Sequence, residues 1–389
     1  MIPYGRQDIT QADIEAVEAV LRSDFLTQGP AVPRLEHAVL HRVGAKRAVA
    51  LNSATSALHV ACLALGLGPG DLLWTVPNTF VASANCARYC GAAVDFVDID
   101  PLTWNISVDS LRTKLAAAQA AGKLPKIVVT VHFGGQPPQQ DAVAALSRQY
   151  GFRIIEDASH AVGASRAAEP VGSCRWSDVT IFSFHPVKII TTGEGGMALT
   201  NDAALADRMG LLRSHGVTRD PEAFTDPIVR VDPPAWYYEQ QVLGFNYRMT
   251  DIHAALGASQ LTRLDDYLQR RNVLAGRYDE ALRNLPLQLP TVLPENRSSF
   301  HLYVVRLHQD AAKSRREVFD ELRAGGIGVN VHYTPVHLQP YYRRLGFHEG
   351  QYPEAEAYGR EAITLPLYPA MSAAIQEQVV TSLRRVLSA

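Results

Sequence analysis

Short apolar runs rich in β-branched residues alternate with helical patterns along the first half of the chain. The runs cover residues 47–51, 72–76, 94–97, 126–131, 153–156, 179–184 and 197–200. Apolar side chains recur at helical spacing in 11–24 and, between the runs, in 53–65, 80–89 and 141–150. Strands separated by helices of this length predict an α/β fold with a mostly parallel sheet covered on both faces. Such sheets bind ligands in the loops that follow the carboxyl ends of their strands.

The pattern changes after about residue 216. A segment rich in proline and aromatic residues, 226–245, leads into a long amphipathic helix that begins near Thr250. A second α/β unit is predicted from a strand at 301–306, a helix at 314–324, a strand near 328–332 and a helix at 373–387. We therefore expect a large domain, residues 1–248 with an N-terminal arm, and a smaller C-terminal domain, residues 249–389, that includes the long connecting helix.

Composition and charge limit the class of partner. The 389 residues carry a formal net charge of −2, so no general positive field attracts nucleic acid or an anionic membrane. No apolar run reaches the length of a membrane span, and the first residues do not have the pattern of a signal peptide. Cys62, Cys86, Cys90 and Cys174 are too few and too scattered for a disulfide framework or a zinc site. We expect a cytoplasmic protein with reduced, mostly buried thiols, and without a metal, a nucleic-acid partner or a membrane partner.

One lysine lies between a short apolar strand and a glycine-rich turn. The run Ser-Phe-His-Pro-Val-Lys at 183–188 is followed by Ile-Ile-Thr-Thr-Gly-Glu-Gly-Gly at 189–196. Incomplete solvation would lower the pKa of Lys188, and a neutral amine forms Schiff bases with aldehydes. A lysine beside such a loop is more often a surface residue, so the motif alone does not decide. Other segments, however, supply the remaining parts of a site for pyridoxal 5′-phosphate (PLP).

The first of these segments is Asn-Ser-Ala-Thr-Ser-Ala-Leu at 52–58, between a strand and the first turn of a helix. Backbone N–H groups and the hydroxyls of Thr55 and Ser56 would point at an anion there, aided by the helix dipole. Simple capping of the helix by Ser53 or Thr55 is the alternative. The segment therefore indicates a phosphate site only in combination with the others.

The second segment is Glu-Asp-Ala-Ser-His at 156–160, at the end of a buried run. A buried carboxylate needs a partner, and the protonated ring nitrogen of PLP would suit Asp157. His160 would donate to the phenolate oxygen of the cofactor or pack on its ring, whereas a helix-capping aspartate and a core histidine are the alternative. Phe80, at the start of a predicted helix, would stack on the same ring, although a single phenylalanine is usually a core residue.

These segments resemble the nucleotide-sugar aminotransferases of PLP fold-type I, the DegT-type family, over essentially the whole chain. The resemblance is carried by residues 25–29, 52–58, 156–161, 183–196, 213–216, 244–252 and 331–335. Segments 52–58 and 183–188 look most like the subgroup that acts in pseudaminic acid biosynthesis. The resemblance implies the PLP fold-type I architecture, which combines a large domain with a mostly parallel central sheet and a smaller C-terminal α/β domain.

The resemblance also implies a role for each matching residue. Lys188 would bind the cofactor and move the proton, Asp157 would pair with the ring nitrogen, and His160 would contact the ring. Thr55, Ser56 and Ser183 would hold the phosphate, and Asn246 would reach the cofactor of the neighbouring subunit, so a homodimer with shared active sites is expected. The sugar nucleotide would be bound by Tyr4, Leu26, Thr27, Gln28, Gly29, Ser56, Val331, His332 and Tyr333.

The activity implied is transfer of the amino group of L-glutamate to C4 of a UDP-linked 4-keto-6-deoxy-2-acetamido-hexose. A 3- or 4-aminotransferase acting on a dTDP- or GDP-ketosugar is the first alternative. A sugar dehydratase of the same fold is disfavoured because related dehydratases carry histidine where this chain has Lys188. A non-catalytic PLP-binding regulator is disfavoured because no basic helix-turn-helix segment is found.

Overall fold

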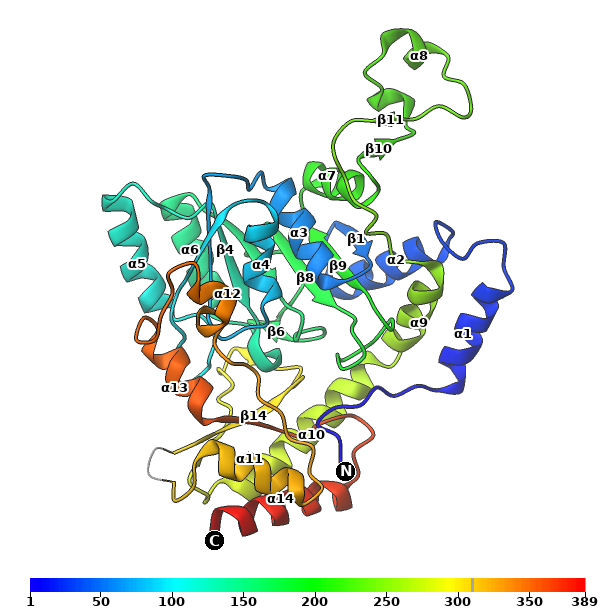
Figure 1. Ribbon diagram of the computed structural model, residues 1–389. Helices are drawn as coiled ribbons and strands as arrows, with labels where there is room; N and C mark the ends of the chain where they lie inside the picture. Colours follow the sequence, from blue (N-terminus) through cyan, green and yellow to red (C-terminus); the bar gives the residue numbers. More distant parts are fainter. Residues whose placement is uncertain (309–310, 389) are drawn as a thin grey trace.

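The computed structural model describes residues 1–308 and 311–388 (Figure 1). Its central element is a seven-stranded sheet in the order β1-β9-β8-β5-β4-β2-β3. The strands are β1 (Arg47–Leu51), β2 (Leu72–Thr75), β3 (Ala93–Phe96), β4 (Ile127–Val131), β5 (Arg153–Asp157), β8 (Val179–Ser183) and β9 (Gly196–Thr200). Only β9 runs antiparallel to its neighbours β1 and β8, and the other adjacent pairs are parallel. The mostly parallel sheet predicted from the sequence is therefore confirmed.

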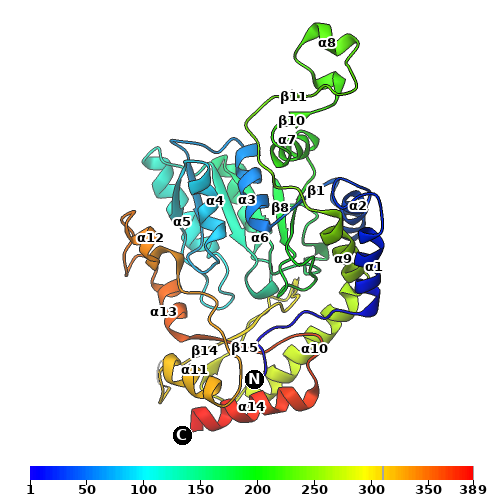
Figure 2. The same cartoon turned by 45° about the vertical axis from the view of Figure 1, so that its right-hand side comes forward.

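Helices cover both faces of this sheet (Figure 2). They are α2 (Ala31–Val43), α3 (Ala54–Ala64), α4 (Ala82–Tyr89), α5 (Val108–Ala120), α6 (Gln140–Tyr150) and α7 (Ala203–Arg213). Successive side chains of a strand point to opposite faces, so Val49 and Leu51 belong to the cluster around α3, whereas Ala50 belongs to the cluster around α2. The helices predicted at 53–65, 80–89 and 141–150 are confirmed as α3, α4 and α6.

The C-terminal part forms a smaller unit below the large sheet (Figure 1). Its antiparallel sheet has the order β12-β14-β15, with β12 (Leu287–Gln288), β14 (Tyr303–Leu307) and β15 (Ala362–Leu365). The predicted strand at 301–306 and helices at 314–324 and 373–387 are confirmed as β14, α11 (Arg315–Ala324) and α14 (Ala373–Ser388). The predicted strand near 328–332 is wrong. The Gly328 N–H bonds instead to the Ile2 carbonyl of the N-terminal arm (2.7 Å), and only Asn330 pairs with β15.

The long helix expected from Thr250 is divided into α9 (Asp251–Leu261) and α10 (Leu264–Leu282). Thr250 caps α9 as its hydroxyl accepts a bond from the His253 N–H (3.2 Å). The break at Thr262 and Arg263 lets α9 contact α2 and α1 (Gln11–Leu21), while α10 continues to the smaller unit and contacts α14. The domain boundary predicted at residue 248 stays a prediction.

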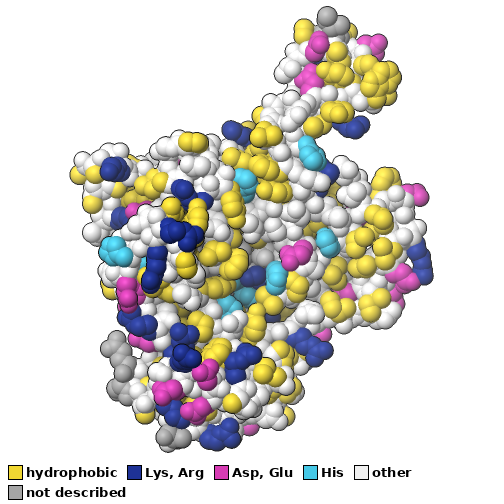
Figure 3. Space-filling model, viewed as in Figure 1, with side chains coloured by type: hydrophobic (Ala, Val, Ile, Leu, Met, Phe, Trp, Pro, Cys, Tyr) yellow, Lys and Arg dark blue, Asp and Glu magenta, His cyan; other side chains and the backbone are white. Residues whose placement is uncertain are grey.

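Residues 217–245 form a segment that projects from the body of the molecule (Figure 1). A two-stranded ribbon of β10 (Val217–Thr218) and β11 (Glu239–Gln240) supports it, and α8 (Pro227–Val231) lies at its tip. Apolar side chains are exposed on this projecting segment (Figure 3): Val231 at 86%, Trp236 at 79% and Leu243 at 81%. The remaining α-helices and strands are α12 (Pro340–Arg343), α13 (Pro353–Glu361), β6 (Ser165–Arg166), β7 (Glu169–Pro170) and β13 (Asn296–Arg297). Across the described residues, none of the helices combines the length and the apolar character needed to span a bilayer.

One buried carboxylate ties helix α1 to helix α9. Asp13 is fully buried and accepts bonds from the Ser259 hydroxyl (2.6 Å), the Gln260 amide (2.8 Å) and the Arg263 guanidinium (2.6 Å). Burial raises the pKa of Asp13, but these bonds and one from Thr10 more than offset that effect, so the pKa lies below its ordinary value of 3.8. Asp13 therefore stabilises the fold above that pH, and the stabilisation is lost as the pH falls through the lowered pKa.

We expect Asp13→Ala to lower the free energy of unfolding by about 3 kcal/mol, because it leaves Arg263 facing the emptied position without a counter-charge. Urea unfolding at pH 7 measures this loss. Asp24→Ala, which removes an exposed acid of the same N-terminal region, is the matched control and should change stability little. Equal stabilities for the Asp13 and Asp24 variants would contradict the role of Asp13.

Candidate active site

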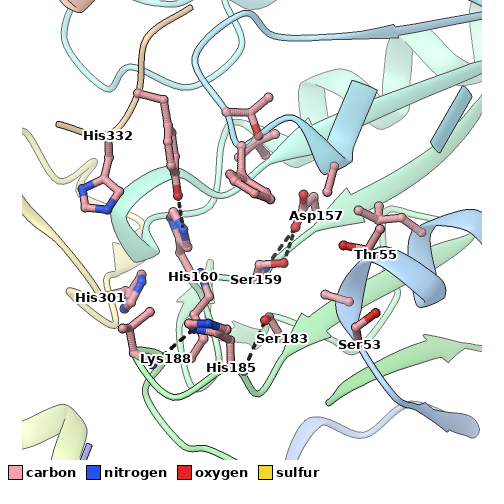
Figure 4. A pocket seen from close by; sticks show the side chains of 18 of the residues that line it. Ser53, Thr55, Asp157, Ser159, His160, Ser183, His185, Lys188, His301 and His332 are labelled. Atoms are coloured by element: carbon pink, nitrogen blue, oxygen red, sulfur yellow. Dashed lines mark hydrogen bonds between the residues drawn. The ribbon is translucent and has the colours of Figure 1, made fainter. Parts of the chain in front are cut away.

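The carboxyl ends of parallel strands meet at one edge of the large sheet. Strands β4, β5 and β8 end there at Val131, Asp157 and Ser183, and β9, which runs the other way, begins there after Gly195. These four residues line a cavity of about 280 Å³ (Figure 4). The cavity thus lies where the sequence predicts a ligand site.

Most of the residues predicted for the site line this one cavity, although they are far apart in the sequence. They are Tyr4, Thr55, Phe80, Asp157, His160, Ser183, Lys188, His332 and Tyr333. Histidine side chains show around the hollow at the centre of this face of the molecule (Figure 3). The N-terminal arm, the large sheet and the C-terminal part therefore all contribute to the same site.

The other predicted residues do not line the cavity. Ser56 is buried against Ser53, whose hydroxyl donates to the Ser56 hydroxyl (3.0 Å). Asn246 is exposed and pairs through its backbone with Ser214. A short segment beside the start of α9 contains Leu26, Thr27, Gln28 and Gly29. Val331 comes directly before His332 and Tyr333, which line the cavity. The roles expected of these residues stay predictions.

Lys188 follows β8 in a turn, where its backbone N–H donates to the carbonyl of His185 (2.9 Å). The next two residues, Ile189 and Ile190, are buried in the core and anchor the turn, so the lysine side chain borders the cavity (Figure 4). Burial of the amine lowers the pKa of Lys188 from 10.5 to about 8, against an opposing effect of Asp157. About a tenth of the amine is therefore neutral and nucleophilic at pH 7, and the fraction rises to one half near pH 8.

Three imidazole rings lie around this amine, and all three are uncharged. Burial lowers the pKa of His160, His301 and His332, and the positive charge of Lys188 lowers each further, His332 to about 3. These rings are thus neutral at physiological pH. They form a wall that removes water from the amine without adding positive charge.

Both ring nitrogens of His160 already have partners. Its Nδ1 accepts a hydrogen bond from the backbone N–H of Gly134 (3.3 Å), and its Nε2 lies 3.1 Å from the Tyr333 hydroxyl. Because Nδ1 accepts, the neutral ring carries its hydrogen on Nε2 and donates it to Tyr333. This arrangement favours packing of His160 on the cofactor ring over donation to its phenolate oxygen.

Asp157 lies at the other end of the cavity, buried and held by hydroxyl groups (Figure 4). Its Oδ1 accepts bonds from the Ser159 hydroxyl (2.6 Å) and the Ser159 N–H (3.2 Å), and its Oδ2 accepts one from the Ser83 hydroxyl (2.6 Å). A carboxylate satisfied in this way remains an acceptor for a protonated ring nitrogen. Sequence reasoning did not identify Ser83 or Ser159, although Ser159 lies inside the motif that contains Asp157 and His160.

The start of α3 supplies an anion site. Ser53 caps this helix by accepting a bond from the Ser56 N–H (3.1 Å), so the capping alternative is correct for Ser53. Thr55 and Ser183 border the cavity beside this helix end, across the cavity from His332 (Figure 4). A Cβ on Gly196 would lie 2.4 Å from the Ala54 nitrogen, so only glycine lets β9 approach the helix end this closely. Helix N–H groups and hydroxyls together suit a phosphate.

These three parts fit PLP. The neutral amine of Lys188 suits its aldehyde, the carboxylate of Asp157 suits its ring nitrogen, and the helix end with Thr55 suits its phosphate. His301 and Glu194 also border the cavity and were not predicted. His301 reaches it from the C-terminal part of the chain, where no local motif indicates a site.

Comparisons with known proteins agree with this geometry. The model of the DegT/DnrJ/EryC1/StrS aminotransferase family matches residues 7–384. The spore coat polysaccharide biosynthesis protein SpsC of Bacillus subtilis is 38% identical over 391 residues, covering 99% of this chain and 97% of SpsC. The UDP-4-amino-4,6-dideoxy-N-acetyl-beta-L-altrosamine transaminase of Campylobacter jejuni is 36% identical over 373 residues, covering 96% of this chain and 94% of the transaminase.

Solved structures show the same fold over the full length. Putative sugar aminotransferase Spr1654 of Streptococcus pneumoniae, in its PMP form, superposes with a TM-score of 0.90 at 30% identity. PseC of Helicobacter pylori, an aminotransferase involved in the biosynthesis of pseudoaminic acid, superposes with a TM-score of 0.90 at 29% identity. Each superposition covers 100% of this chain and 99% of the relative. The chain therefore belongs to the DegT/DnrJ/EryC1/StrS family and is a PLP-dependent sugar aminotransferase.

Proposed function

We propose that this enzyme transfers the amino group of L-glutamate to C4 of UDP-2-acetamido-2,6-dideoxy-hexos-4-ulose. The product would be a UDP-4-amino sugar for a surface glycan of the pseudaminic acid type. The observation that carries amino transfer is the buried amine of Lys188 in one cavity with Asp157. The choice of sugar is supported by the similarity to the Campylobacter transaminase and to PseC.

The reaction needs one group that removes a proton from a substrate carbon in the first half-reaction and returns a proton to a substrate carbon in the second. PLP, when bound, supplies a carbonyl that accepts amines and a ring that accepts electrons from the carbon losing its proton. The Lys188 amine would remove the α-proton of glutamate in the first half-reaction and deliver a proton to C4 of the sugar in the second. Asp157 keeps a proton on the ring nitrogen throughout. Both half-reactions use one site, so ping-pong kinetics are expected.

The wall opposite Asp157 excludes water from this proton transfer. It is formed by Tyr4 of the N-terminal arm and by His301, His332 and Tyr333 of the C-terminal part. Burial raises the pKa of Tyr333, and the nearby charge of Asp157 raises it further, so its hydroxyl stays protonated. The wall therefore offers neutral hydrogen-bonding groups to a bound sugar and leaves Lys188 as the group that changes protonation.

We propose a second copy of the chain as the partner, in a cytoplasmic homodimer with shared sites. Among the residues that the structure describes, those lining the cavity include one lysine and no arginine, although glutamate and the sugar nucleotide are both anions. The projecting segment exposes Trp236 and Leu243 to solvent, and Asn246 is exposed at its base. A neighbouring subunit that covers this apolar surface would bring further groups to the cavity.

Amination of a dTDP- or GDP-linked ketosugar is the remaining alternative among enzymes. The cavity-lining residues are assigned to the cofactor and to the reacting part of the sugar, so the choice of nucleotide base would fall to residues expected outside the cavity, such as Thr27 and Val331. A regulator that binds PLP without turnover would need no proton-transferring amine, whereas the lowered pKa of Lys188 suits catalysis.

A panel of UDP-, dTDP- and GDP-4-ketosugars, with glutamate as donor and NMR identification of the product, tests the proposed function. We expect amination of the UDP-2-acetamido sugar at C4 and at least 10-fold lower kcat/KM for the other sugars, since each carries groups that the site would not pair. Lys188→Ala is the control and should give a folded protein without turnover. Preference for a dTDP- or GDP-sugar would overturn the substrate assignment, and turnover by the Lys188 variant would overturn the mechanism.

The pH dependence of cofactor capture reports the pKa of Lys188. The neutral amine attacks the aldehyde, so capture by the cofactor-free protein should speed up with rising pH and be half-maximal near pH 8. Asp157→Asn removes the charge that raises this pKa, so its profile should move to lower pH. Stopped-flow absorbance measures the rate after mixing with PLP. A half-maximal rate near pH 10.5 would show that the amine is solvated.

Mixing two inactive variants tests whether the sites are shared. In a hybrid of Lys188→Ala and Asn246→Ala subunits, one site would carry both defects and the other would carry neither. If Asn246 acts in the neighbouring site, re-association of equal amounts should restore activity to about a quarter of the wild-type value by random pairing. If Asn246 acts in its own subunit, every site keeps one defect and no activity returns.

A further inference from the structure

The carboxylate of Asp157 is held by a chain of hydroxyl groups that begins outside its own strand. The Thr79 and Ser83 hydroxyl oxygens lie 2.7 Å apart, and the Ser83 hydroxyl lies 2.6 Å from Asp157 Oδ2. We propose that Thr79 and Ser83 are positioning residues that orient the Asp157 carboxylate toward the ring nitrogen of PLP before the cofactor binds. This inference rests on the role proposed above for Asp157.

The direction of the bonds follows from the chemistry of the three groups. A carboxylate accepts hydrogen bonds only, so the single hydroxyl proton of Ser83 is committed to Asp157. Between Thr79 and Ser83 either atom could donate, but Ser83 has no second proton to give. Thr79 is therefore the donor, and the order Thr79 to Ser83 to Asp157 is fixed. Each bond in such a chain polarises the next, which strengthens the contact with the carboxylate.

Burial makes these bonds effective. Ser83 is fully buried, and Thr79 and Asp157 are 3% and 6% exposed, so water does not compete for the hydroxyl groups. Ser83 lies in the first turn of α4, so its hydroxyl bonds to Asp157 from the N-terminal end of that helix, where the helix dipole is positive. The Ser159 hydroxyl holds Oδ1 from the loop after β5. The two oxygens of Asp157 are thus fixed from two different elements, which prevents rotation of the carboxylate about its last bond.

The same short segment also carries Phe80, the residue expected to stack on the cofactor ring. Thr79 and Phe80 both line the cavity, and the Thr79 N–H donates to the carbonyl of Pro77 (3.1 Å) in the turn that precedes α4. The bond between Thr79 and Ser83 connects this turn to the helix. The hydroxyl chain therefore couples the position of the ring-stacking residue to the orientation of the ring-pairing carboxylate.

Two variants test the two hydrogen bonds separately. Ser83→Ala removes the donor to Asp157 and should weaken PLP binding on the order of 10-fold, the loss typical of a hydrogen bond to a charged group. Thr79→Val keeps the shape of the side chain and leaves Ser83 in place, so we expect a smaller loss of about threefold. Equilibrium titration of the cofactor-free protein with PLP, followed by visible absorbance, gives both dissociation constants.

A second measurement distinguishes a lost orientation of the Asp157 carboxylate from a general loss of packing around the site. The visible circular dichroism of bound PLP, divided by its absorbance, reports how the ring is held in its asymmetric site. We expect this ratio to fall in Ser83→Ala and, less so, in Thr79→Val. Thr75→Val is the matched control, because Thr75 is an equally buried threonine whose hydroxyl bonds to the Val129 carbonyl (3.1 Å) and not to Asp157. It should leave both measurements unchanged.

The inference is overturned if Thr79→Val and Ser83→Ala bind PLP within twofold of wild type with an unchanged dichroism ratio. It is also overturned if Thr75→Val causes the same losses, because the effect would then be one of packing. No sugar substrate enters these measurements. An enzyme that failed to aminate the proposed sugar would therefore overturn the proposed function and leave this result intact.

Discussion

The burial of one amine and one carboxylate at the same edge of a sheet sets the conditions for the rest of the site. Burial lowers the pKa of Lys188, whereas the charge of Asp157 raises it. Burial is the larger of the two effects, so the pKa of the amine stays lowered. The hydroxyls of Ser83 and Ser159 hold the Asp157 carboxylate at its own end of the cavity.

That arrangement works only if water is kept out, and the large sheet alone does not close the cavity. The aspartate ends β5, the lysine lies in the turn after β8, and the helix end that suits a phosphate is the start of α3, which follows β1. The remaining wall comes from Tyr4 in the N-terminal arm and from His301, His332 and Tyr333 in the C-terminal part. The contact of Gly328 with Ile2, which replaces the strand predicted near 328–332, joins the arm to this wall. The position of the arm is thus linked to the enclosure of the site.

Features with a local signal in the sequence could be predicted, and features created by tertiary packing could not. The strands of the large sheet are continuous apolar runs, and Asp157 and Lys188 follow two of them, so their meeting at one edge was predictable. Helices α5 and α7 were not predicted because few of their side chains are buried and their apolar periodicity is weak. Helix α2 was also missed, although it buries five residues, with a proline in its first turn. The break between α9 and α10 and the position of His301 at the cavity depend on contacts between distant segments. Such contacts leave no pattern in either segment alone.

The distribution of charge supports the proposal that two copies of the chain share each site. The cavity holds the groups proposed to act on the cofactor, and its lining, among the described residues, includes one lysine and no arginine. Several residues that match the family pattern, including Thr27 and Asn246, are instead exposed outside the cavity, and the nearby projecting segment exposes apolar side chains such as Trp236. Exposed apolar surface is costly in water, and residues that match the family pattern outside the cavity would gain a role at the site of a neighbouring subunit. Both observations would be explained if a second copy of the chain covered that surface.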